Sequence, residues 1–289
     1  QPEIVRARGL DPDPQWRELA AAAQPCAAAG DLLLFPLRSG EQTIGLVALG
    51  PRALGLPYSE NDIDFISGLI AQASVALDNA WHFRDTLYRR QLEKELSLAA
   101  SIQADLFPKS IPVLPATEIA ARNRQAREVG GDYYDVLAAG PPAPQTPHLL
   151  CVADISGKGL SAALLMANIQ ATLRALLSSS PPLTALAAQA NDLLWASTPS
   201  NKYATAIFVL YDPLSGACQF VNGGHSEGIL LRASGQVELL ESTGTPLGLL
   251  PNRTFESLPF QLLRGDTLLL YSDGVTDACT ASDEEFGLH

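Results

Sequence analysis

The sequence predicts an α+β fold built mostly from antiparallel sheets, with helices layered outside them. Two observations carry this prediction. From residue 118 onward, short apolar runs rich in strand-favouring residues flank turn signals such as Asp212-Pro-Leu-Ser-Gly216, which is the pattern of β-hairpins. Only two segments with helical apolar spacing, at about 160–176 and 183–195, interrupt these runs. So many hairpins with so few helices indicate an α+β sandwich.

The first elements along the chain are a hairpin and a helix. Apolar runs at 31–37 and 43–49, joined by a polar turn, predict two antiparallel strands. Ser59 stands before acidic residues at the start of a periodic segment, which predicts a capped helix N-terminus. Because prolines begin at Pro108, we expect this helix to end near Phe107.

Small and apolar residues recur along this helix at alternating spacings of three and four, as in a coiled-coil seam. The first part of the seam consists of Ile66, Leu69, Ala73, Ala76, Ala80, Phe83 and Leu87. The seam slips phase near Tyr88 and resumes as Leu92, Leu96, Ala99, Gln103 and Leu106. Two interpretations stay open: a stalk that pairs two copies into a homodimer, or one amphipathic helix packed on its own domain.

The later strands are predicted as one strand that ends at Asp154 and three hairpins. The hairpins pair Tyr203–Tyr211 with Ala217–Asn222, Ile229–Arg232 with Gln236–Leu240, and Phe255–Leu263 with Asp266–Ser272. Apolar positions on the two helices, Met166 included, are expected in the core.

The composition argues against some classes of partner. Asp and Glu number 31 against 19 Lys and Arg, a formal charge of −12, so neither nucleic acid nor an anionic membrane is expected as the main partner. No uninterrupted apolar segment reaches membrane-spanning length. The four cysteines are scattered without metal-type pairing, which suits a reducing cytosol. Because Gln1 is not an initiator Met and no structural signal closes the chain at His289, we expect a longer protein at both ends.

Three aspartates share one local design. Asp132 follows Gly-Gly, Asp154 ends a strand before Ile-Ser-Gly, and Asp273 precedes Gly274 after an apolar run. Each alone is weak evidence, since Asp beside Gly most often makes a turn. Together they suggest carboxylates gathered at one end of a sheet, where cations offset their repulsion. Oxygen ligands without a His or Cys cluster point to Mg²⁺ or Mn²⁺.

Two other interpretations of the segment around Asp154 fit less well. Asp154 stands too early to cap the helix that starts near Leu160, for which Ser156 or Ser161 is better placed. A phosphate-binding loop would need Ser or Thr after Lys158 and a glycine several positions upstream, and both are absent.

Six motifs occur in a fixed order. They are Leu98-Ala-Ala-Ser-Ile-Gln-Ala-Asp-Leu-Phe-Pro108, Arg127-Glu-Val-Gly-Gly-Asp-Tyr-Tyr-Asp135, Val152-Ala-Asp-Ile-Ser-Gly-Lys-Gly-Leu-Ser-Ala-Ala-Leu-Leu-Met166, Asn222-Gly-Gly-His225, Gly244-Thr-Pro-Leu-Gly248 and Tyr271-Ser-Asp-Gly-Val-Thr-Asp-Ala278. Over about residues 92 to 287 the chain thereby resembles the SpoIIE/RsbU-like branch of the PPM metal-dependent serine/threonine phosphatases. The resemblance implies a PPM-type α-β-β-α sandwich.

The resemblance also implies a set of site residues. Asp154 corresponds to the carboxylate that bridges two Mn²⁺ or Mg²⁺ ions, with the carbonyl of Ile155 as a further ligand. Asp132 and Asp273 correspond to further metal ligands, and Arg127 to a phosphate-holding arginine. The implied reaction is attack of activated water on phosphorus without a phosphoenzyme. A further metal-binding Asp is expected beyond residue 289.

Two positions depart from the family pattern. Ser156 stands where animal and plant members carry a His that can act as general acid, so no proton donor is identified. In the motif Asn222-Gly-Gly-His225, Gly223 replaces the usual Ala and Ser226-Glu227 replaces Asn-Pro. His225 is therefore expected to be a structural loop residue rather than a catalyst.

Residues 30 to 82 resemble the C-terminal half of a GAF sensor domain, on the hairpin, the helix start and the pattern Ala76-Leu-Asp-Asn-Ala80. The sequence thus predicts a partial GAF-like α/β domain at 1–82, a linker helix at 83–113 and a PPM-type domain, truncated at its C-terminus, at 114–289.

Two functions are implied by these resemblances. The first is a cytoplasmic bacterial phosphatase acting on phosphoserine or phosphothreonine of an anti-anti-sigma (STAS) protein in partner switching. The alternative is a PPM-fold interaction module that is weakly active or inactive. Retention of three clustered carboxylates favours the enzyme.

Overall fold

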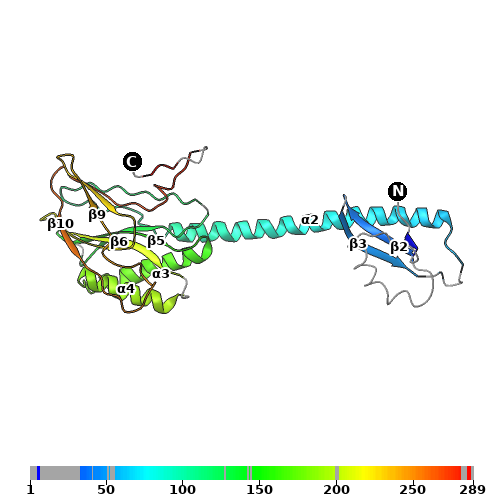
Figure 1. The fold of residues 1–289 in the computed structure, drawn as a ribbon, viewed down its shortest axis with the longest axis horizontal. Coiled ribbons are helices and arrows are strands. Elements are labelled where there is room, and N and C mark those ends of the chain that lie inside the picture. Colours follow the sequence, from blue (N-terminus) through cyan, green and yellow to red (C-terminus); the bar gives the residue numbers. More distant parts are fainter. Residues whose placement is uncertain are drawn as a thin grey trace. The chain divides into compact units, whose positions relative to one another are not determined.

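The computed structural model describes residues 5–6, 33–40, 42–50, 52, 56–126, 128–141, 143, 145–198, 202–280 and 285–287 (Figure 1). Within it the chain forms two compact units, Gln1–Glu93 and Lys94–His289, which divide inside one helix. The domain boundaries expected at residues 82 and 113 stay predictions.

The first unit holds a small antiparallel sheet covered by a helix. Strands β1 (Val5–Arg6), β2 (Leu33–Ser39) and β3 (Gln42–Leu49) pair in that order. The β2–β3 pair is the hairpin that the sequence predicts, with a register shift at Leu37/Arg38. Phe35 of β2 and Ile70 of the covering helix are buried together in the core of this unit.

Helix α2 (Glu60–Ala104) begins in the first unit and ends in the second. Its start is capped as predicted: the Ser59 N–H and hydroxyl donate to Asp62 Oδ2 at 2.9 and 2.7 Å, and the Asp62 N–H donates to Ser59 Oγ at 3.3 Å. Many apolar side chains of its middle are exposed, among them Phe83 at 66%. The homodimer and the single-helix interpretations of the seam therefore both stay predictions.

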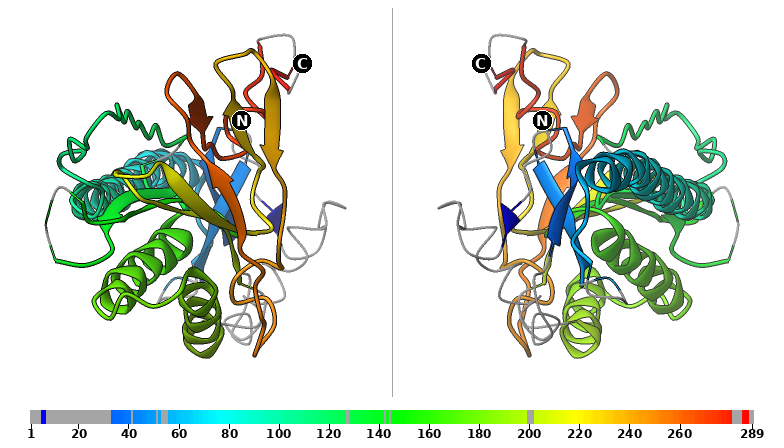
Figure 2. Two further views of the ribbon diagram at one scale, coloured as in Figure 1. Left: turned by 90° about the vertical axis from the view of Figure 1, so that its left-hand side faces the viewer. Right: turned by 90° about the vertical axis from the view of Figure 1, so that its right-hand side faces the viewer.

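The described part of the second unit contains two antiparallel sheets. The larger has the order β10-β7-β6-β5-β4, and the smaller the order β11-β8-β9. The strands are β4 (Tyr133–Ala138), β5 (His148–Ile155), β6 (Ala204–Tyr211), β7 (Ala217–Gly223), β8 (Gly228–Leu231), β9 (Val237–Leu240), β10 (Leu258–Gln261) and β11 (Thr267–Leu269). Helices α3 (Leu160–Leu177) and α4 (Leu183–Ser197) lie side by side on one face of the larger sheet (Figures 1 and 2).

Two cores give the unit its layers. Leu149, Cys151 and Ala153 of β5 are buried in the cluster that includes the apolar faces of α3 and α4. The alternate residues Leu150 and Val152 pack in a second cluster with residues of the smaller sheet. This alternation along one strand places helices, sheet and sheet in three layers and confirms the α+β class. Among the described residues, α3 and α4 form the one helical layer packed on this sandwich.

Helix α3 is the described helix that is long and apolar enough, by length and composition, to cross a membrane. Its apolar residues have another explanation, because Ala162, Met166 and Leu173 are fully buried in the core beside the sheet. The prediction that Met166 belongs to the core is confirmed.

The third predicted hairpin is wrong. Strand β10 pairs with β7 in the larger sheet, whereas β11 pairs with β8 in the smaller one. The turn between them carries the chain from one sheet to the other. Asp266 holds this turn by accepting the N–H groups of Leu263 and Ala233, each at 3.0 Å, and a guanidinium N–H of Arg232 at 2.8 Å. Turn signals between apolar runs do not reveal which sheet the second run joins.

A buried carboxylate joins β4 to α3. The side chain of Asp135 is 1% exposed and pairs with Arg174 at 2.6 Å. The Tyr133 hydroxyl and the Val136 N–H also donate to it, at 2.7 and 2.9 Å. The strand and the helix are therefore tied through one charged group.

We predict that Arg174→Ala lowers the free energy of unfolding by about 1–3 kcal/mol, because it leaves a buried carboxylate with neutral donors only. Urea denaturation monitored by circular dichroism measures this change. Arg89→Ala is the control: its pair with Asp85 is exposed, so the expected change is below about 0.5 kcal/mol. Equal effects of the two substitutions would contradict the prediction.

Candidate metal centre

Strand pairing brings two of the predicted ligands to the same edge of the larger sheet. Strand β4 pairs with β5 so that Tyr133 lies opposite Ala153. Asp132 and Asp154 are the next residues outward on the two strands, and they leave the paired region at the same end. Both side chains are partly buried. The register alone therefore makes these two carboxylates neighbours.

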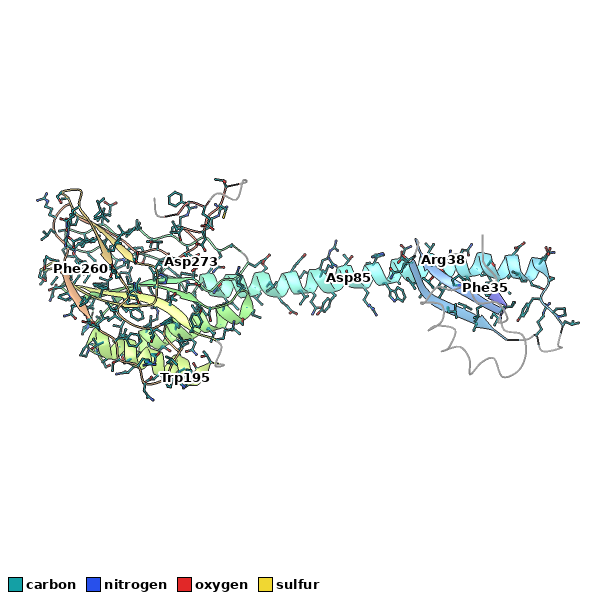
Figure 3. All side chains as sticks on the ribbon, viewed as in Figure 1. Phe35, Arg38, Asp85, Trp195, Phe260 and Asp273 are labelled. Atoms are coloured by element: carbon teal, nitrogen blue, oxygen red, sulfur yellow. The ribbon has the colours of Figure 1, made fainter. Side chains whose placement is uncertain are left out.

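Asp273 comes from a turn that follows β11 (Figure 3). Its main-chain carbonyl accepts the N–H of Asp277 at 2.8 Å and the hydroxyl of Thr276 at 2.9 Å. These bonds leave the Asp273 carboxylate outside the turn's own network, and the residue is exposed.

The charges of the three aspartates act on one another. Burial, and then the charges of Asp132 and Asp273, raise the pKa of Asp154 to about 6. Burial also raises the pKa of Asp132; the nearby hydroxyl of Ser272 opposes this rise, and the charge of Asp273 adds to it. The three aspartates are thus close enough for their charges to interact, and their role as metal ligands stays a prediction.

Gly131 shows how closely the segments approach. A Cβ atom at this position would lie 2.7 Å from the carbonyl oxygen of Ile155 and 3.2 Å from Asp154 Oδ1. Only glycine fits against these oxygens without displacing them. The Gly-Gly-Asp segment and the Asp154-Ile155 strand end are therefore in direct contact.

The donor set suits a hard divalent cation. It combines three carboxylates with one main-chain carbonyl, that of Ile155, and contains neither thiolate nor imidazole. Across the residues that the structure describes, no three His, Cys, Asp or Glu side chains converge tightly enough to enclose a metal ion. The arrangement is thus an open set of oxygen atoms, and the mutual repulsion of its carboxylates is what a cation would relieve.

Of the other predicted residues, only Ser156 and His225 fall within the described part of the chain. Arg127 lies outside the described residues. Ser156 accepts the N–H of Tyr203 on its hydroxyl oxygen at 3.0 Å. His225 is 7% exposed, and its Nδ1 lies 2.9 Å from Thr205 Oγ1. Burial lowers the pKa of His225 to about 4.

Sequence reasoning missed Ser272 as a partner of Asp132. The signal was present, because Ser272 directly precedes Asp273 in the Ser-Asp-Gly motif. A serine before an aspartate, however, is equally typical of an ordinary turn. Ser272 lies near Asp132 only because the fold brings these two distant segments together.

The fold and the sequence both have known counterparts. The SiaA-PP2C domain of Pseudomonas aeruginosa superposes with a TM-score of 0.55 at 18% identity, covering 69% of this chain and 79% of that one. This likeness defines a PP2C-type fold. Residues 144–289, just over half of the chain, match the family model described as Stage II sporulation protein E (SpoIIE). The chain belongs to this family. Residues 1–78 match a GAF domain model.

Curated relatives extend over both units. Protein IcfG of Synechocystis sp. is 28% identical over 93% of this chain and 43% of its own length. Phosphoserine phosphatase RsbU of Bacillus subtilis is 22% identical over 78% of this chain and 66% of its own length. Phosphoserine phosphatase RsbP of Bacillus subtilis is 27% identical over 70% of this chain and 49% of its own length. The chain thus spans between 43% and 66% of the length of these relatives.

We predict that Gly131→Ala weakens Mn²⁺ binding by about tenfold or more, because the added methyl group displaces the Ile155 carbonyl or the Asp154 carboxylate. Isothermal titration calorimetry measures the affinity. Gly68→Ala is the control, since its Cβ would meet nothing within 4 Å. Unchanged affinity in Gly131→Ala would refute the role of this contact.

We also predict that Asp154→Asn stabilises the metal-free protein near neutral pH. The folded-state pKa of about 6 lies above the usual value of 3.8 for an aspartate. Folding therefore favours the protonated carboxyl group of Asp154. The folded protein loses stability as the pH rises through about 6, because this group then ionises. The expected gain is about 1 kcal/mol once solvent screening is allowed for. It should vanish near pH 4, as thermal unfolding in excess chelator would show; a gain of the same size at both pH values would rule out this cause.

Proposed function

We propose that the chain is the catalytic part of a metal-dependent protein phosphatase that hydrolyses phosphoserine or phosphothreonine on a regulatory protein. The observation that carries the proposal is the approach of Asp132, Asp154 and Asp273 from three separate segments, close enough for the charge of Asp273 to raise the pKa of both Asp132 and Asp154. Two relatives in the same family bear the name phosphoserine phosphatase, which supports this substrate class.

Each residue of the cluster has a proposed task. Asp132, Asp154 and Asp273, together with the Ile155 carbonyl, would hold two Mn²⁺ or Mg²⁺ ions, with Asp154 between them. When bound, such ions supply Lewis acidity and an activated water for phosphoryl transfer. Ser272, whose hydroxyl lowers the pKa of Asp132, would help to orient that carboxylate, and Gly131 lets the two strand ends approach. Arg127 is proposed to hold the substrate phosphate.

The proposed substrate is a phosphorylated STAS-type anti-anti-sigma protein in the bacterial cytoplasm, which places the chain in partner switching. The relatives RsbU and RsbP support this reading at the level of the family. We further propose that the GAF-like unit controls the phosphatase unit through α2, because this helix is continuous from one unit to the other. A homodimer through the exposed seam of α2 is part of the same proposal.

The second candidate function is a PPM-fold module that binds its partner without turnover. The open arrangement of the described ligands favours it over full activity in this chain alone. Turnover separates the two functions, because both predict that a STAS protein binds.

We predict that the protein releases phosphate from a phosphoserine STAS substrate only with Mn²⁺ or Mg²⁺. Asp154→Asn should lower kcat/KM by more than about a hundredfold, because it removes a charge between the proposed ions. Phosphate release measured by malachite green tests this. Asp105→Asn, at an exposed aspartate paired with Lys109, should leave the rate unchanged. Turnover in excess chelator would exclude the metal mechanism, and binding of the STAS protein without turnover would favour the second function.

A further inference from the structure

We propose that Gln103 is a positioning residue for the metal centre, and that it acts by clamping the main chain just before Asp132. This inference rests on the proposed metal-dependent function. The sequence places Gln103 on the coiled-coil seam of the helix. In the structure it stands in the last turn of α2, within the second unit, and is 3% exposed.

The side-chain amide of Gln103 makes a closed pair of hydrogen bonds with one residue. Its Nε2 donates to the Gly130 carbonyl at 2.8 Å, and its Oε1 accepts the Gly130 N–H at 3.1 Å. Both main-chain groups of Gly130 are thereby satisfied by one side chain. Gln125 Nε2 donates to the same Oε1 at 2.9 Å, which fixes the orientation of the amide. A buried amide with all these partners has little freedom to move.

Gly130 is one residue from the contact on which the metal centre depends. The next residue, Gly131, lies against the Ile155 carbonyl and Asp154 Oδ1, with room for a hydrogen but not for a methyl group. Asp132 follows directly, and its carbonyl accepts a long hydrogen bond from Asn123 Nδ2, at 3.5 Å. A shift of Gly130 by a few tenths of an ångström would therefore move a ligand or press on its neighbours.

The clamp is distinct from the bonds that anchor the end of the helix. Gln170 of α3 donates through Nε2 to the Leu106 carbonyl at 3.3 Å, and the Phe107 ring packs in tilted contacts against Tyr133 and Tyr134. These contacts hold the chain after α2 to the same unit without touching residues 130–132. A substitution at the half-buried Gln170 thus removes a side-chain amide hydrogen bond to a main-chain carbonyl without reaching residues 130–132.

The test compares Gln103→Met with Gln170→Met in the full chain. Methionine keeps the length and helix propensity of glutamine and removes its hydrogen bonds. Binding of Mn²⁺ is measured by electron paramagnetic resonance of the free ion, which needs no turnover. Thermal unfolding in chelator and hydrogen–deuterium exchange of the peptide that contains Gly130 are measured on the same samples.

We expect Gln103→Met to weaken Mn²⁺ binding about tenfold and to speed exchange at Gly130, whereas Gln170→Met leaves the Mn²⁺ affinity unchanged. If Gln103→Met does not fold, Gln125→Met replaces it, because it frees Oε1 of the clamp; a smaller loss of affinity in the same direction is expected. Unchanged Mn²⁺ affinity in the variant tested overturns the inference. So does an equal loss in Gln170→Met, which would reveal general destabilisation.

Failure of the proposed metal-dependent function would give a different result from failure of the Gln103 inference. If the wild-type protein itself binds no Mn²⁺, or if Asp154→Asn binds it as tightly as the wild type, the metal centre is wrong, and the inference falls with it. If the wild type binds Mn²⁺ and Asp154→Asn does not, the metal centre stands, and the Gln103 result alone decides the inference.

Discussion

The pairing of β4 with β5 is the constraint on which the rest of the site depends. Because Tyr133 lies opposite Ala153, Asp132 and Asp154 emerge at one end of the pair, and a slip of β4 by one residue would turn Asp132 to the other face of the sheet, away from Asp154. The register in turn requires Gly131, since any side chain there would meet the Ile155 carbonyl. The adjoining Gly130 makes two main-chain hydrogen bonds with the buried side-chain amide of Gln103. The β4–β5 register, Gly131 and the Gln103 side-chain amide thus act together to position the carboxylates of Asp132 and Asp154.

The carboxylate cluster opposes the folding of the metal-free chain, and the surrounding layers offset this cost. Burial and mutual repulsion raise the pKa of Asp154 to about 6, so at neutral pH its ionised form is disfavoured by its surroundings. Strand β5 tolerates this because both of its faces are packed, one toward the helices and one toward the smaller sheet. A bound cation would relieve the repulsion between these carboxylates. Its binding would therefore stabilise the folded protein relative to the unfolded chain.

Helix α2 has two kinds of environment along its length. Its middle carries exposed apolar side chains such as Phe83, whereas its last turn buries Gln103 against the Gly130 main chain. A single spacing pattern runs through both regions in the sequence. The pattern is therefore ambiguous about function: the same seam position can face solvent, another chain or a catalytic loop.

The sequence by itself determined the α+β class, the three aspartates as candidates and the first hairpins, because alternation, turn residues and Asp beside Gly are local signals. Tertiary structure alone decided that β10 and β11 join different sheets, that Ser272 serves Asp132 and that Gln103 clamps Gly130. Those features depend on which distant segments meet. Periodicity reports which face of an element is buried, but it carries no information about the partner that buries it.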